Sequence, residues 1–596
     1  MKKTWDLTPL YENETDPQIE QDLQQVLTYY QAIQQVLTTS DAFEVGIIRD
    51  VLIHQQQAAA LASKLGAFAN LSMTVNTKNQ AAINLLNRLQ VEFSNYANLD
   101  VLFGDYLATA SEEAFEDLFV IGGDELILEH RYLLTKHREH ARYLLSAEEE
   151  AILAKMQLTG SHAWSQFRDQ VTSSLEFTMT QAEEEQTLPI TMVSKFLMDA
   201  DPDIRREAYF SANKAYATAA DSAAMALNSI KGESITENKL RGYDSLLQEI
   251  LLDSHLQEAT LTTMLRVIEQ SLPIFQRYYK IKARLLGHVD GLKPYDLYAP
   301  LGTADLNYDL EAGCQFVVET LATVHPQMSE FIAQAIEKSW IDFLPRADKV
   351  GGAFCQNIRG FGESRILLNY NGTYNDVSTL AHELGHAYHG HVLNQESVLN
   401  TSYPMPLAET ASTFNEILIA QAIKKSADDQ TLFTILNQEL STHALINNGV
   451  YARFLFEDAV IKRREQGLLS REEICELYHE CETKAYGEAV DLSESQSLGW
   501  VMTPHYYIPG FHYYNFPYTF GLLYAKGLYA KYLKSPETFC EQYDQMLRLT
   551  GKADIEDVTK TMGIDVQDEQ FWYDAVAVME ADVQLYEQLA NKLYGV

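Results

Sequence analysis

The sequence predicts a mainly α-helical protein with more than one lobe. Apolar residues recur at helical spacing over most of the 596 residues. Strand-like patterns are confined to two short regions, near 175–190 and 350–372. A chain of this length exceeds what one hydrophobic core usually serves, so we expect two or more lobes with a cleft between them.

The N-terminal part is predicted to form helical hairpins. Asp16 and Pro17 mark a helix start, because a capping residue is followed by proline at the first helical position. The apolar residues after them are spaced alternately four and three, as in a coiled-coil seam: Ile19, Leu23, Val26, Tyr30, Ile33 and Leu37. Two further long helices are expected over about 43–70 and 78–108.

Few segments have strand character. Leu175, Phe177 and Met179 alternate with polar residues, and the segment 188–190 is expected to return beside them as a short ribbon. The glycine-punctuated segment 350–372 is predicted to be extended.

Composition and charge exclude several classes of function. The formal net charge is −38, so contacts with nucleic-acid phosphates are not expected. The sequence has no run of 18 apolar residues and no apolar stretch after its first lysines, so neither a membrane span nor a secretory signal is expected. Five cysteines without a C-x-x-C pair suggest free thiols. We therefore expect a cytoplasmic protein.

The most informative segment is His382-Glu383-Leu384-Gly385-His386, an H-E-x-x-H motif. On a helix, positions i and i+4 lie one above the other, so two imidazoles can hold one metal ion with Glu383 beside them. Such a motif also arises by chance. Here both histidines lie off the apolar stripe of the helix, which favours a metal site. That stripe consists of Val377, Leu380, Ala381, Leu384, Ala387 and Tyr388.

The third metal ligand is expected to be acidic. The metzincin pattern needs glycine and histidine where this chain has His389 and Val392, so it fails. The acidic candidates are Glu396, Glu409 and Glu416. Glu409 follows a proline-containing break and shares a face of the next helix with Glu416. We predict Glu409 as the ligand and Glu416 as the acceptor of a ligand histidine N–H. The competing interpretation is a solvated acidic helix face.

This donor set predicts hydrolysis by a metal-activated water. Two histidines and one carboxylate favour zinc, which lowers the pKa of its water toward about 7. Glu383 would take the proton and pass it to the leaving amine. The oxyanion needs a further donor, and 505–524 is rich in tyrosine hydroxyls. Packing in a core is the competing explanation for these aromatic residues.

Three segments resemble the M3 family of zinc metallopeptidases, and within it the oligoendopeptidase F branch. They are NYNGTYNDVSTLAHELGHAYHGH at 369–391, AETASTFNE at 408–416, and the aromatic stretch at 505–521. Weaker similarity covers most of the chain after about residue 110. The resemblance implies two helical lobes around a deep substrate channel, with a small β-sheet near a zincin-like active site. It also implies cleavage of internal bonds in short peptides.

The resemblance also assigns roles to residues. One zinc per chain would be held by His382, His386 and Glu409, with Glu383 as general base. A histidine and tyrosines in the aromatic stretch would stabilise the tetrahedral intermediate, and the following residues lie there: His505, Tyr507, Tyr514 and Tyr518. Their spacing differs from that of thimet-type relatives, so which tyrosine serves is left open.

Two further expectations concern organisation. Residues 1–195 would form an N-terminal helical lobe, with a part at about 111–185 like the N-terminal region of oligopeptidase F, and 196–596 would form the catalytic domain. Gly351, Gly352 and Ala353 would bind the substrate backbone as an added strand. The chain would be a monomer or a small homo-oligomer.

Two alternatives compete with the endopeptidase. A carboxypeptidase or dipeptidase on a related scaffold would need a basic anchor for the substrate C-terminus, for which Arg365 and Arg453 are candidates. A catalytically silent peptide-binding protein is disfavoured, because the histidines and Glu383 are all present.

Overall fold

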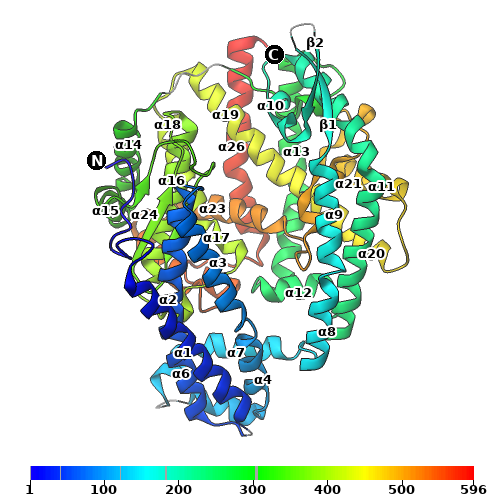
Figure 1. The fold of residues 1–596 in the computed structure, drawn as a ribbon. Coiled ribbons are helices and arrows are strands. Elements are labelled where there is room, and N and C mark those ends of the chain that lie inside the picture. Colours follow the sequence, from blue (N-terminus) through cyan, green and yellow to red (C-terminus); the bar gives the residue numbers. More distant parts are fainter. Residues whose placement is uncertain (1, 41, 121–122, 182–183, 303–306) are drawn as a thin grey trace. The chain divides into compact units, whose positions relative to one another are not determined.

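The computed structural model describes residues 1–596 except 1, 41, 121–122, 182–183 and 303–306. Most of the described chain is helical (Figure 1), which confirms the predicted mainly α class. The chain forms two compact units, each assembled from segments distant in sequence. Unit 1 comprises 1–144, 306–422 and 531–564, and unit 2 comprises 145–305, 423–530 and 565–596. The predicted sequence domains, 1–195 and 196–596, divide the chain differently and stay a prediction.

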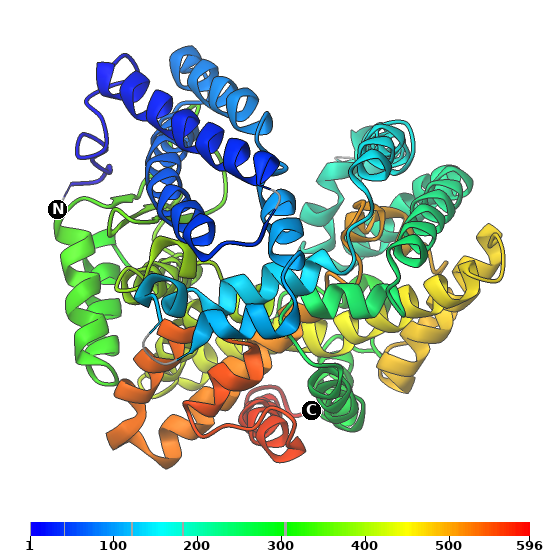
Figure 2. The same ribbon diagram turned by 90° about the horizontal axis from the view of Figure 1, so that it is seen from below.

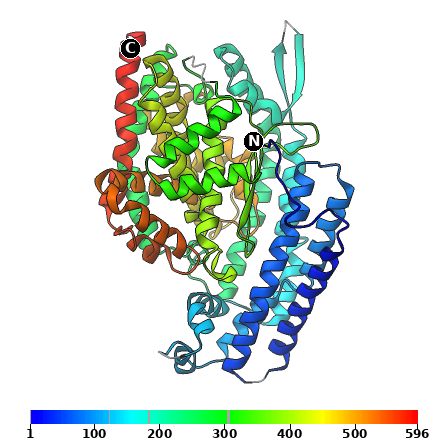
Figure 3. The same cartoon turned by 90° about the vertical axis from the view of Figure 1, so that its left-hand side faces the viewer.

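Unit 1 begins with three long helices that lie side by side (Figure 3): α1 (Pro17–Thr39), α2 (Val45–Thr74) and α3 (Gln80–Ser94). Helix α1 starts where predicted, because the Asp16 side chain accepts a hydrogen bond from the Gln18 N–H. The seam of α1 is buried apart from Tyr30, which is half-buried.

The single helix predicted over 78–108 is wrong, because the chain turns at 95–98 between α3 and α4 (Leu99–Ala108). At the end of α3 the Ser94 hydroxyl donates to Val91 O, a local bond that competes with continued helix.

A three-stranded sheet in unit 1 lies in and beside the predicted extended segment. Its order is β3 (Ile341–Asp342), β5 (Glu363–Leu367), β4 (Phe354–Ile358), with β3 parallel and β4 antiparallel to β5. Helix α16 (Tyr374–Leu393) packs against β4 and β5. Ile358 and Leu367, at strand ends, are buried in the same apolar cluster as residues of α1, α2 and α3.

The remaining helices of unit 1 include α14 and α15, which lie side by side in Figure 2. The bounds are α5 (Glu112–Glu116), α6 (Glu125–Glu129), α7 (Arg131–Ala141), α14 (Leu310–Ala322), α15 (Pro326–Glu337), α17 (Met405–Ala408), α18 (Thr410–Lys424), α24 (Pro536–Leu549) and α25 (Ile555–Lys560). Helix α18 ends just inside unit 2 by sequence.

Unit 2 contains the predicted ribbon and a set of long helices. Strands β1 (Glu176–Gln181) and β2 (Glu184–Pro189) pair antiparallel, with Phe177 opposite Leu188, which confirms the ribbon (Figure 3). Helix α11 (Pro202–Arg241) packs against β1 and α9 (Ser161–Ser173). Its alanine-rich face forms a core with residues of α20 (Val450–Arg464) and α21 (Arg471–Tyr486).

The other helices of unit 2 include α13 (Glu258–Leu285), which packs on α26 (Glu569–Tyr594). The rest are α8 (Ala147–Gln157), α10 (Val193–Leu197), α12 (Leu246–Asp253), α19 (Asp429–Ala444), α22 (Gly499–Met502) and α23 (Phe516–Lys534). Among all helices in the described ranges, none combines the length and apolar character that a membrane crossing requires.

Candidate metal centre and active site

Helix α16 carries the H-E-x-x-H motif and is capped at its start. Thr373 is the N-cap: its hydroxyl accepts from the Asp376 N–H, and Asp376 Oδ2 accepts from the Thr373 N–H. The helix is thus closed by a capping box in which Asp376 is the reciprocal partner of Thr373. All six residues of the predicted apolar stripe are buried. This packing leaves His382 and His386 half-buried on another face.

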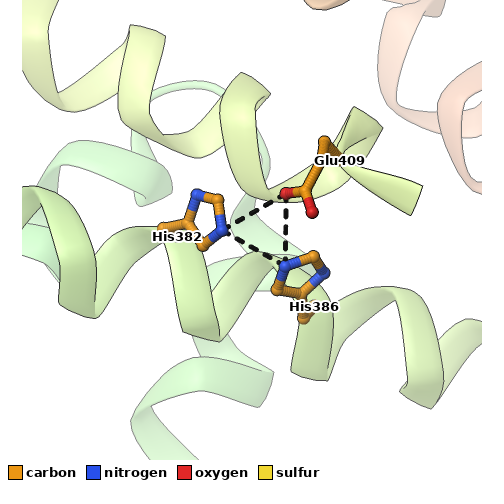
Figure 4. Close-up of side chains that lie close together, drawn as sticks. All are labelled: His382, His386 and Glu409. Carbon is orange, nitrogen blue, oxygen red and sulfur yellow. Dashed lines mark hydrogen bonds and ion pairs between the residues drawn. The ribbon is translucent and has the colours of Figure 1, made fainter. Parts of the chain in front are cut away.

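The three predicted ligands lie together in unit 1 (Figure 4). His382 Nε2 is 3.2 Å from His386 Nε2, and Glu409 Oε2 lies 3.3 Å and 3.4 Å from these two atoms. Two ligand atoms at about 2.0–2.1 Å from a tetrahedral zinc are about 3.3 Å apart. The triangle of donor atoms therefore has the size that a zinc ion requires, and three protein donors leave one position for water.

Three contacts fix Glu409 beside the metal helix. Glu409 lies at the junction of α17 and α18, and Ser412 Oγ donates to its Oε2 over 2.8 Å. The α18 backbone passes very close to α16 at Gly385, where a Cβ atom would lie 2.5 Å from Ala411 O. Asn415 Nδ2 also donates to Ala381 O, which ties the two helices together. Absence of a side chain at Gly385 is thus a condition for this geometry.

Glu416 contacts the other ring nitrogen of His382. Its Oε1 lies 2.5 Å from His382 Nδ1, and Ser378 Oγ donates to Oε2 over 3.4 Å. Such a contact holds the proton on Nδ1 and leaves Nε2 as the donor atom for a metal.

The electrostatics of the cluster are those of an acid–base network. Burial alone would lower the pKa of His382, but its hydrogen bonds with Glu409 and Glu416 raise it to about 10. Burial would raise the pKa of Glu409, yet the two histidines hold it well below its usual range. Glu383 is 6% exposed, and burial raises its pKa. A carboxylate of raised pKa suits a proton acceptor that later returns the proton.

The other polar residues near the motif have structural partners. His389 is fully buried, donates or accepts at Nε2 with Thr550 Oγ1 over 2.8 Å, and stacks on Tyr403 at 4.2 Å. Burial lowers the pKa of His389 to about 3, so it is neutral. Glu396 pairs with Lys552 and lies 3.8 Å from Arg548, away from the metal candidates.

The three residues predicted to bind substrate lie directly before β4. Gly351 and Gly352 are exposed, Ala353 is half-buried, and Asn369 Nδ2 donates to Gly352 O. Among the described strands β4 pairs only with β5, so no other strand occupies its second edge. The strand is also tied to the metal helix, because Asn357 Nδ2 donates to His386 O.

The predicted oxyanion donors belong to unit 2. His505 lies in η8 (Pro504–Tyr507), and its ring centre is 5.0 Å from that of Tyr514. The Tyr518 hydroxyl, on α23, donates to the Tyr514 hydroxyl over 3.4 Å. Tyr507 is separate: it is buried, and its hydroxyl donates to Trp500 O. The structure thus groups His505 with Tyr514 and Tyr518, but not with Tyr507.

A helical H-E-x-x-H pair completed by a glutamate from a following helix is the donor set of a zincin-type metallopeptidase. The family model for peptidase family M3 matches residues 196–578, and the model for oligopeptidase F matches 107–177. The chain belongs to peptidase family M3.

Relatives and solved structures are similar over nearly the whole chain. An oligoendopeptidase F homolog from Lactococcus lactis subsp. lactis (strain IL1403) is 24% identical, over 99% of this chain and 98% of that protein. Oligopeptidase PepF from Bacillus subtilis (strain 168) is 23% identical, over 91% and 81%. A solved chain from Chlamydophila abortus superposes with a TM-score of 0.87 at 22% identity, covering 98% of both chains. Oligoendopeptidase-F from Enterococcus faecium has a TM-score of 0.69 at 20% identity, covering 96% and 98%. These structures share the fold.

Proposed function

We propose that this peptidase is a zinc-dependent oligoendopeptidase that hydrolyses internal bonds of short peptides. The observation that carries the proposal is the donor triangle of His382 Nε2, His386 Nε2 and Glu409 Oε2, whose 3.2–3.4 Å sides fit one tetrahedral zinc. The names of the matched relatives, oligoendopeptidase F and oligopeptidase, support the substrate class.

Each residue of the proposed site has a separate role in the reaction. A bound zinc would supply a Lewis acid that activates water and polarises the scissile carbonyl. Glu383 accepts the proton of the attacking water and passes it to the leaving amine. Glu416 keeps His382 in the tautomer that donates through Nε2. His505, Tyr514 and Tyr518 offer donors to the oxyanion, with Tyr507 the weaker candidate because its hydroxyl is already used.

Substrate binding is proposed at the edge of β4 that pairs with no described strand. An extended peptide would add a strand there, with the backbone of Gly351, Gly352 and Ala353 at its start. The Asn357 bond to His386 O supports this, since it fixes the strand against the metal helix. The proposal also includes a cytoplasmic location, a monomer or small homo-oligomer, and a catalytic domain over 196–596.

The experiment that tests the proposal is product analysis by mass spectrometry. The protein, with its metal content measured, is incubated with a ten-residue peptide blocked at both ends. An endopeptidase produces two internal fragments. If only peptides with a free C-terminus are shortened, the proposal is wrong and the exopeptidase alternative takes its place.

A further inference from the structure

Arg453 is a half-buried arginine that makes no hydrogen bond or ion pair within the described ranges of the chain. It lies on α20 in unit 2. Its charge interacts with four phenols from three other segments: Tyr298, Tyr478, Tyr486 and Tyr506. Burial would lower the pKa of Arg453, but these phenols raise it above its ordinary value, so the guanidinium stays charged.

Two other buried arginines in the described part of the chain, Arg205 and Arg365, are paired. Arg205, 1% exposed, bonds Asp296 and two backbone carbonyls. Arg365, also 1% exposed, bonds the carbonyls of Asp6 and Ser364 and pairs with Glu363. All three guanidinium nitrogens of Arg365 are therefore already engaged within the chain. Because a desolvated guanidinium is retained at a cost unless it is paired, Arg453 needs a different explanation.

Three more polar atoms beside Arg453 are buried and have no hydrogen-bond partner: Glu482 Oε2, Tyr506 Oη and His505 Nδ1. Buried polar groups are almost always satisfied, so a cluster of exceptions points to a missing partner. Burial raises the pKa of Glu482 to about 7, with the Arg453 charge opposing the rise. Glu482 is thus partly protonated near neutral pH and gives Arg453 no full counter-charge. The cluster reaches solvent at Tyr298, which is 39% exposed.

The arginine is adjacent to the proposed catalytic aromatic group. Phe456, three residues after Arg453 on α20, has its ring centre 5.1 Å from that of Tyr506, the neighbour of His505 in η8. Burial and then the charge of Arg453 also lower the pKa of His505. The His505 ring is in turn 5.0 Å from the Tyr514 ring. All of these residues belong to unit 2.

We propose that Arg453 is a specificity-determining residue that binds a carboxylate of the peptide substrate, with the surrounding tyrosine hydroxyls as secondary donors. The planar guanidinium binds a carboxylate through two parallel N–H bonds, and phenols can donate to its remaining lone pairs. The carboxylate comes from an acidic side chain or from the free C-terminus of a short peptide. This inference rests on the proposed peptidase function.

The test compares paired substrates on wild type and three variants. In the first pair, both fluorogenic peptides are blocked at both ends and differ only in having Glu or Gln at one position, and this position is moved along the peptide. In the second pair, the peptides differ only in ending in a free carboxylate or an amide. Wild type should favour the carboxylate member of one pair by about tenfold or more, mainly through KM. The pair that discriminates identifies the source of the carboxylate. Arg453→Met should abolish the preference, and Arg453→Lys should retain part of it.

Arg463→Met is the matched control, because Arg463 lies on the same helix, is 51% exposed and pairs with Glu473. It should keep the preference of wild type. The proposal is overturned if wild type discriminates within neither pair, or if Arg453→Met keeps the preference. A purely structural role predicts a lower melting temperature for Arg453→Met, whereas removal of an unpaired buried charge should leave it unchanged or raised. The proposal is also contradicted if Arg453→Met clearly lowers the melting temperature while Arg453→Lys discriminates between the paired peptides as wild type does.

A binding assay distinguishes failure of this inference from failure of the proposed function. The Glu383→Gln protein is titrated with the same peptides, labelled for fluorescence anisotropy, with and without Arg453→Met. If the peptides bind more tightly with the carboxylate and Arg453→Met abolishes this difference, carboxylate binding by Arg453 is supported even if no peptide is cleaved. If the peptides are cleaved but the carboxylate changes neither binding nor KM, the proposed peptidase function is supported and carboxylate binding by Arg453 is refuted.

Discussion

Replacement of Gly385 by alanine tests how closely the two ligand helices must approach. A Cβ at Gly385 would lie 2.5 Å from Ala411 O, 2.6 Å from Ser412 Cα and 2.7 Å from Ala411 C. Ordinary van der Waals contact begins near 3.4 Å, so α18 would have to move away by about 0.9 Å. These contacts are backbone atoms, which cannot rotate aside, and they lie two and three residues after Glu409.

The cost in stability is small, but the cost in metal affinity is large. Alanine favours a helix interior by about 1 kcal/mol over glycine, whereas an overpacked contact costs about 1–3 kcal/mol. The free energy of unfolding should therefore change by no more than about 2 kcal/mol. Metal–ligand distances tolerate only about 0.2 Å, so displacement of Glu409 should weaken zinc binding at least about tenfold.

Two measurements and a control decide the outcome. Zinc affinity is measured by competition with a chelator, and stability by thermal unfolding of the metal-free protein. Gly66→Ala is the control, because Gly66 lies within α2 and a Cβ there meets no atom within 4 Å. It should be neutral or stabilising and should leave zinc affinity unchanged. Wild-type zinc affinity in Gly385→Ala would refute the argument that this close approach sets the position of Glu409.

Three further predictions follow from the same site. Glu416→Gln should weaken zinc binding by about 10–100-fold with little loss of stability, measured by chelator competition, and an unchanged affinity would remove Glu416 from the site. The pKa of His382 is raised from 6.5 to about 10 in the metal-free protein, so its stabilising effect is complete below pH 6.5 and is lost as the pH rises towards 10. Zinc must displace this proton, so its affinity should rise with pH over that window, and calorimetry in buffers of different ionisation heat should show proton release; a pH-independent affinity would contradict it. Tyr518→Phe should lower kcat by about 10²-fold at constant zinc content. Tyr507→Phe should mainly lower the melting temperature, because it loses the hydrogen bond to Trp500 O. The reverse pattern would exchange the roles of the two tyrosines.

Local patterns predicted much of the fold. The Asp16–Pro17 start of α1 and the β1–β2 ribbon depend on capping and on period-two alternation, which are properties of neighbouring residues. The break at 95–98 was missed, because apolar periodicity continues across it while Ser94 bonds back to Val91.

Only those features of the candidate site that follow from the spacing of residues along a helix were predictable from the sequence. The spacing of His382 and His386 on one helix, and of Glu409 and Glu416 near the next, suggested the donor set. The contact of Gly385 with the α18 backbone was not predictable, because it depends on how two helices pack. The unpaired state of Arg453 was not predictable either, because only a structure shows that the guanidinium of Arg365 is paired and that of Arg453 is not.

The most direct test of the account is cleavage of a quenched fluorescent peptide of about ten residues, blocked at both ends, by wild type and by Glu383→Gln, with zinc content measured in both. Glu383 is buried beside the donor triangle but is not part of it, so the variant should keep one zinc per chain. The account predicts internal cleavage by wild type and a loss of at least about 10²-fold in kcat for the variant. Undiminished cleavage by zinc-loaded Glu383→Gln, or no cleavage by zinc-loaded wild type, would contradict it.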